Sequence, residues 1–216
     1  MAENISNNHV VKKYSTLIGI IIALCLLFIA MMVYPGGSRA DKNSVGFDWK
    51  NNFISNLFGE NAINGSPNTS RVWAIGGMFF LSIAFAIFFA GFSKRIPSKS
   101  GAWVIKYFGI AAMICTFLVV TRYHDIMVTI ACTFTLVSIF YITVFVLKSK
   151  LHFFKVLSVI CMLVFYIAMY IYYSGNFIQL LAILQKLDLI IVVIWMLSLQ
   201  FFTSVNDFQP TKIPVQ

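Results

Sequence analysis

The sequence predicts an all-α fold, a polytopic transmembrane bundle of six helices. Of the 216 residues, 60% are hydrophobic and 11% are charged, and the mean hydropathy is +0.86. A soluble domain carries about 45–50% apolar and about 25% charged residues, and one protein core could not cover so much apolar surface. The apolar residues fall into six runs, each long enough as a helix to cross a bilayer core of about 30 Å. Helix is expected because lipid leaves the backbone groups of an open strand unpaired, and the alternating segments of a membrane barrel are absent.

We expect a single membrane domain covering residues 1–216. In chain order, the predicted spans are 14–34, 72–92, 102–121, 126–147, 156–173 and 189–205. The first, second and fourth runs contain no charged residue. The third contains Lys106 near its start, where a long side chain can extend to the interface. The fifth run is on the short side for a membrane span.

The first run has some features of a signal peptide. Lys12 and Lys13 precede it, and small residues flank Arg39 where a cleavage site would lie. The run is about 21 residues long, however, whereas the apolar part of a signal peptide usually has about 7–15. The length favours an uncleaved first helix.

The distribution of Lys and Arg orients the bundle with both termini in the cytoplasm, because cytoplasmic segments carry an excess of basic residues. With the N-terminus inside, ten basic residues fall on the inner side: Lys12, Lys13, Lys94, Arg95, Lys99, Lys106, Lys148, Lys150, Lys155 and Lys212. Six fall outside: Arg39, Lys42, Lys50, Arg71, Arg122 and Lys186. The long segment 35–71 then lies on the outer side.

Two segments outside the predicted spans are too apolar to be free linkers. Residues 53–58 in the long outer loop are expected to form a short helix at the interface. Residues 177–187 either lie on the outer surface or extend the last helix. Lys186 and Asp188 are therefore expected just outside the last span. No internal repeat is evident and no unpaired charge lies near the centre of a predicted span, which disfavours inverted-repeat transport and dedicated ion transport.

Several function classes are excluded or disfavoured. The net charge of +9 comes from basic residues in short segments between apolar runs, as in loops facing an anionic leaflet, so no nucleic-acid partner is expected. His9 and His152 fall on the cytoplasmic side and His124 falls outside, which excludes a three-histidine metal site. The four cysteines all lie inside apolar runs, and hydrolase and phosphate-loop motifs are missing. We predict no metal and no cofactor.

The densest polar cluster is the tight outer turn of Arg122, Tyr123, His124 and Asp125. One reading is structural, because Asp125 would begin the fourth helix and Arg122 would end the third, where each charge suits the helix dipole. A binding site is a second reading. A third is catalysis, with Ser55 from the long loop as nucleophile beside His124 and Asp125.

Polar and aromatic residues in the long outer loop form the second candidate site. The loop either folds as a lid, with Asp48 and Glu60 pairing with Arg71 and Arg122, or stays solvated with surface ion pairs of small worth. The aromatic content of the loop gives a lid something to bury. The predicted ligand-binding residues are Asp48, Trp49, Asn52, Ser55, Asn56, Glu60, Asn68, Arg71, Arg122 and His124.

The segment Phe-Ile-Ser-Asn-Leu-Phe-Gly at 53–59, followed by Pro67 and Asn68, resembles the first outer loop of the DRAM-like (damage-regulated autophagy modulator) membrane family and of related prokaryotic families of unknown function. Those proteins carry an Ile-Ser-Asp/Glu-Leu-Gly-like element and a later Pro-Asn or Pro-Glu. Here Asn56 stands where an acid is usual, and Phe58 intervenes before Gly59. The resemblance covers about residues 50–92 and implies a six-helix bundle with a structured outer loop, but no agreed activity. It marks Ser55, Asn56, Gly59, Pro67 and Asn68.

These observations favour a non-enzymatic multi-pass protein of the plasma membrane or a bacterial inner membrane. We expect it to bind a membrane lipid or small amphiphile between the outer helix ends and the 35–71 loop, whose polar and aromatic residues lie above an apolar bundle. A membrane-embedded hydrolase or transferase using Ser55, His124 and Asp125 is one alternative. A structural or assembly partner that docks through the second span is another. The oligomeric state is left open.

Overall fold

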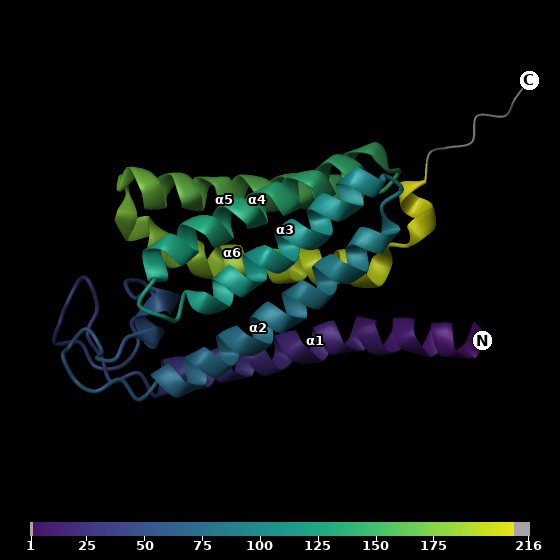
Figure 1. Ribbon diagram of the computed structural model, residues 1–216. Coiled ribbons are helices and arrows are strands. Elements are labelled where there is room, and N and C mark those ends of the chain that lie inside the picture. The colour runs from purple at the N-terminus through teal and green to yellow at the C-terminus, as the bar shows by residue number, and fades with distance from the viewer. Residues whose placement is uncertain (1, 210–216) are drawn as a thin grey trace, which may run out of the picture.

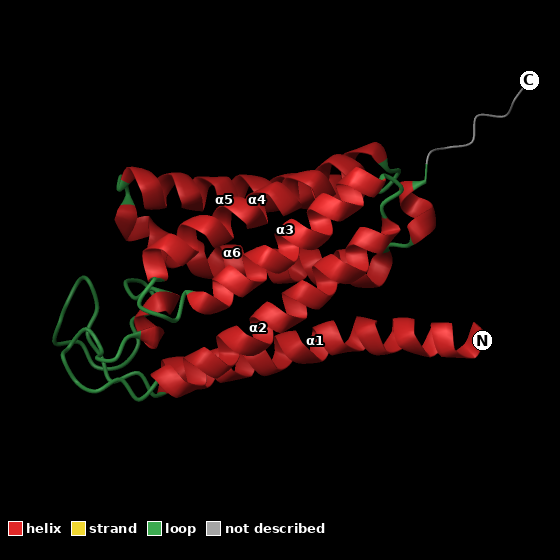
Figure 2. Cartoon of the chain, in the orientation of Figure 1, coloured by secondary structure: helices red, strands yellow, loops and turns green. Residues whose placement is uncertain are grey.

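The computed structural model describes residues 2–209, with side chains from residue 14 onward, and confirms an all-helical fold (Figures 1 and 2). Six long helices follow one another, and each is long and apolar enough to cross a membrane. They are α1 (Ala2–Met32), α2 (Arg71–Phe92), α3 (Lys99–Leu118), α4 (His124–Lys148), α5 (His152–Ser174) and α6 (Ile178–Phe202). Three short 3-10 turns, η1 (Ile54–Phe58), η2 (Ser93–Arg95) and η3 (Val205–Phe208), complete the described helices.

Helices that are consecutive in sequence pack against each other most extensively, so the bundle is a series of antiparallel hairpins. In Figure 1 the chain between α1 and α2 forms a loop cluster at one end of the bundle. The start of α1 and the end of α6 lie at the opposite end. We call these the loop end and the terminal end. That the terminal end faces the cytoplasm remains a prediction from the distribution of Lys and Arg.

The last helix begins at Ile178, eleven residues before the predicted start at 189. The preceding turn is tight, because Gly175 ends α5 with φ 70° and Phe177 has φ 56°. No helix-breaking residue follows, so the backbone stays helical through the charged residues that interrupt the apolar run. The expectation that Lys186 and Asp188 lie outside the last span is therefore wrong: both lie within the 25-residue span Ile178–Phe202.

The terminal end is closed by an arginine and an aromatic cluster. The Arg95 guanidinium donates from Nη1 to the carbonyls of Leu199 (2.7 Å) and Thr203 (2.9 Å), and from Nη2 to that of Gln200 (3.1 Å). Leu199 and Gln200 belong to the last turn of α6, whose carbonyls have no intrahelical backbone donors, and Thr203 is the residue that caps the helix. Beside the arginine, four rings pack together: Phe88, Phe92, Trp195 and Phe208. Arg95 thus fastens the α2–α3 connection to the end of α6.

At the loop end, residues 35–70 fold into a compact structure. The Asn68 amide donates to three carbonyls, those of Asn56 (3.2 Å), Leu57 (3.2 Å) and Gly59 (3.0 Å). Leu57 is fully buried beneath this network. Gly37 has φ +83°, and a Cβ there would collide with the Asn64 backbone, so the loop requires glycine at this position.

Candidate functional cavity

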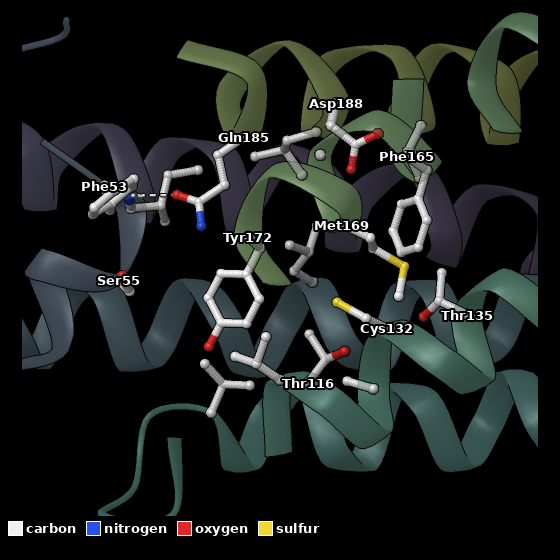
Figure 3. A pocket seen from close by; sticks show the side chains of 18 of the residues that line it. Phe53, Ser55, Thr116, Cys132, Thr135, Phe165, Met169, Tyr172, Gln185 and Asp188 are labelled. Carbon is white, nitrogen blue, oxygen red and sulfur yellow. Dashed lines mark hydrogen bonds between the residues drawn. The ribbon is translucent and has the colours of Figure 1, made fainter. Parts of the chain in front are cut away.

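A cavity of about 460 Å³ opens at the loop end, between α2, α3 and α4 on one side and α5 and α6 on the other. Figure 3 shows side chains from several helices pointing into it. Its size falls in the range of about 300–1,000 Å³ that is typical of ligand pockets. All six long helices and the loop contribute to its wall.

The lining changes from polar to apolar with depth. Toward the loop end it carries Arg39, Ser55, His124, Asp125 and Gln185. Deeper in the bundle it is formed largely by apolar and aromatic side chains, among them Phe85, Phe89, Met113, Ile139, Phe165, Trp195 and Met196. Of these, Trp195 belongs to the aromatic cluster that closes the terminal end, and Phe89 packs against Phe88 of that cluster. The cavity is thus amphipathic along its length.

Residues 53–58, which include η1, cover the cavity, and we call them the roof. Two adjacent side chains of α6 contact the roof and Asn52, the residue that precedes it. The Gln185 Oε1 accepts a hydrogen bond from the Ile54 backbone N–H (3.1 Å), as Figure 3 shows. The Lys186 Nζ donates to the carbonyls of Asn52 (2.7 Å) and Ala182 (2.6 Å). The roof is therefore fixed to the helix that forms the opposite wall.

Asp188 lies in the cavity wall, ten residues from the start of α6, which is about 15 Å along the helix axis. Its Oδ1 is buried and has no hydrogen-bond partner. Figure 3 shows Asp188 among the side chains that line the cavity, together with Phe165, Cys132 and Thr135. A buried carboxyl without a partner costs free energy and marks a candidate functional group within a membrane. Sequence reasoning missed it because Asp188 was placed outside the last span.

Ser55, His124 and Asp125, the predicted catalytic candidates, all line the cavity. His124 Nδ1 lies 2.9 Å from Asp125 Oδ1, and the Asp125 side chain is largely exposed. No hydrogen bond joins Ser55 to His124 among the described residues, so the three side chains do not form a triad here. Asp125 lies in the first turn of α4, as the structural reading expected, but the N-cap is Tyr123 and makes no side-chain cap.

Most of the other predicted ligand-binding residues build the loop. Asn52 is buried, accepting from the Asp48 N–H (2.8 Å) and donating to the Gly37 carbonyl (2.9 Å). Asn56 accepts from the Phe53 N–H (2.6 Å), and Asn68 makes the three-carbonyl contact described above. Of the ten predicted residues, only Ser55 and His124 line the cavity. A binding role for the others stays a prediction.

The remaining predicted residues lie on the surface of the loop end. Trp49 is 54% exposed and packs edge-on against Phe47. The hydrogen bond from the Asn51 side chain (2.7 Å) is the main cause that lowers the pKa of the Asp48 carboxyl. Arg122 stacks over the Tyr123 ring.

The ion pairs expected of a lid form only in part. Glu60 pairs with Arg71 (3.4 Å), and this exposed pair contributes little stability. Neither Asp48 nor Arg122 belongs to a salt bridge in the described part of the chain. The loop is held instead by side-chain to backbone hydrogen bonds and by its buried apolar residues.

Among the side chains that the structure describes, those of residues 14–209, no group of three or more His, Cys, Asp or Glu could hold a metal ion. The side chain of His9 lies outside the described residues.

No protein-family model, curated protein or solved structure matches the chain. The resemblance to the DRAM-like family stays a prediction from the loop motif. The chain is a multi-pass helical membrane protein, and its function has to be inferred from its own cavity.

Proposed function

We propose that the protein binds a lipid or another small amphiphile in the cavity at its loop end, without catalysing a reaction on it. The observation that supports this most directly is the cavity of about 460 Å³, apolar in its depth and polar where it meets the roof. The apolar body of the molecule would lie against the helices, and polar lining groups such as Arg39, His124 and Gln185 would orient it. Ligand pockets commonly combine such an apolar wall with a few polar groups that fix orientation.

The predicted orientation places this cavity on the extracytoplasmic side of a plasma membrane or bacterial inner membrane. The roof then separates the cavity from the aqueous phase, while exposed apolar residues on the bundle surface face lipid. The protein would act as a binding or carrier protein for a lipid or another small amphiphile.

The proposal predicts that filling the cavity prevents ligand retention. Ala168 on α5 lines the cavity, whereas its neighbour Ile167 is 47% exposed on the outside of the bundle. Ala168→Trp should fill the cavity, and Ile167→Trp should place the same side chain toward lipid. Each protein would be purified in a mild neutral detergent, and co-purifying small molecules would be measured by native mass spectrometry.

We expect the unsubstituted protein and Ile167→Trp to retain a bound amphiphile, and Ala168→Trp to lose it. Thermal unfolding of both variants shows whether each is folded. The proposal is wrong if nothing stays bound to the unsubstituted protein, or if folded Ala168→Trp retains as much as Ile167→Trp.

A further inference from the structure

Building on the proposed function, we infer that the cavity takes an amphiphilic amine, an apolar molecule carrying an ammonium group, and that Asp188 is its anionic partner. Asp188 lies in the wall of the cavity, with a buried oxygen that no protein group satisfies. A carboxylate held in an apolar site is stabilised strongly by an adjacent cation. The protein provides the anion and leaves the cation to the ligand.

The nearby protein cations are engaged elsewhere. Lys186 is only two residues away, but its Nζ donates to the Asn52 and Ala182 carbonyls, toward the loop end of α6. Arg39 lies at the polar end of the cavity, 5.5 Å from the centre of the Phe53 ring. The thiols that interact electrostatically with Asp188 from α4 and α5, those of Cys132 and Cys161, carry no positive charge in either protonation state. No salt bridge of the described residues includes Asp188.

The walls around Asp188 suit an organic cation better than a small hydrated ion. Aromatic rings of Phe165, Tyr172 and Trp195 line the same cavity, and an ammonium group is attracted to ring faces. The Trp195 ring is held in place by its Nε1 hydrogen bond to Ser158 Oγ (2.8 Å). Most polar side chains of the cavity lie near the roof, so few are close enough to Asp188 to replace the hydration shell of a metal ion. An apolar body with one cationic group matches both features.

Two ligand sources share this chemistry, a free hydrophobic amine and a lipid with an amino headgroup. The position of Asp188, about 15 Å along α6 from its loop end, favours a free amine, because a lipid headgroup prefers the interface. The experiment below includes an arm for each source.

The test uses the buried Trp195 as a reporter inside the cavity. Trp49, Trp73 and Trp103 are exposed, and replacing them with Phe leaves Trp195 as the source of tryptophan fluorescence. The full chain in phosphatidylcholine nanodiscs is titrated with ω-bromoundecylamine and, separately, with ω-bromoundecanol. Bromine quenches a nearby indole, and a fully buried ring is shielded from probe dissolved in the surrounding lipid.

We expect saturable quenching by the amine and an affinity for the alcohol that is weaker by about tenfold or more, the loss that follows removal of a charge-assisted contact. Asp188→Asn should lower the affinity for the amine to that for the alcohol, and Asp188→Glu should restore part of it. Asp207→Asn, a matched change in η3 at the terminal end, should leave both affinities unchanged. Repeating the titration in phosphatidylethanolamine nanodiscs separates the sources: competition supports an aminolipid, and equal affinity supports a free amine.

The inference is wrong if the amine and the alcohol bind the unsubstituted protein equally, or if folded Asp188→Asn binds the amine normally. The proposed function would survive that result, since saturable binding of an amphiphile would still be seen. Absence of saturable quenching by either probe would overturn both. If Asp188→Asn does not fold, the comparison of the two probes on the unsubstituted protein decides.

Discussion

At the scale of single residues, the least expected feature is a carboxyl group inside the bundle. The sequence singled out Ser55, His124 and Asp125, and the structure brings all three to one cavity. The loop could be expected to fold over the helix ends because its apolar residues need burial. Ser55 and His124 line the same cavity although they are 69 positions apart in sequence (124 − 55). Asp188 could not be found in that way, because a charged residue beside an apolar run is normally assigned to the interface.

If the Asp188 carboxyl group is kept for binding, it should lower the free energy of unfolding of the ligand-free protein. Asp188→Leu removes a buried, unsatisfied oxygen and adds apolar contact, so we expect the free energy of unfolding to rise by about 1–3 kcal/mol. Unfolding by a denaturing detergent in mixed micelles measures it. Asp207→Leu is the contrasting variant, since Asp207 accepts from the Ser204 N–H (2.7 Å) and its loss should not stabilise. A less stable Asp188→Leu protein would show that the carboxyl supports the fold.

At the scale of elements, six helices could be predicted because each apolar run matches the thickness of a bilayer. The beginning of α6 could not, since hydropathy does not distinguish a polar residue inside a helix from one beyond its end. The turn at Gly175 and Phe177, with positive φ at both, sets that beginning. The loop fold also depends on long-range contacts, such as Ile54 with Gln185, that no local pattern shows.

The contact between the roof and α6 is itself testable. Gln185→Ala removes the acceptor of the Ile54 N–H, and a lost hydrogen bond of about 1 kcal/mol should make local opening about fivefold more frequent. Hydrogen–deuterium exchange of peptides covering residues 53–58 should therefore become faster. Gln179→Ala changes the same residue type in the first turn of α6, where the side chain is exposed, and should have no effect. Equal exchange in both variants would mean that Gln185 does not hold the roof.

At the scale of the whole molecule, the two ends of the bundle are built differently. Arg95 and an aromatic cluster join α2 and α6 at the terminal end, whereas at the loop end the same helices line a cavity and are bridged by the roof. Because only the loop end contains the cavity, the orientation of the bundle in the membrane decides which side of the membrane the cavity faces. The direction in which it faces determines where a ligand would enter.

Charge distribution predicts that direction, with the terminal end in the cytoplasm. Ser66→Cys in the long loop and Lys150→Cys in the α4–α5 turn are both at exposed positions, at opposite ends of the bundle. In intact cells, a membrane-impermeant maleimide should label Ser66→Cys, and should label Lys150→Cys only after permeabilisation. The unsubstituted protein measures the background from its four native cysteines, all within the spans. Labelling of both variants in intact cells would contradict a six-span topology. The reverse pattern would keep the fold but turn the cavity toward the cytoplasm, because a bundle of six spans can present its hollow end to one side only.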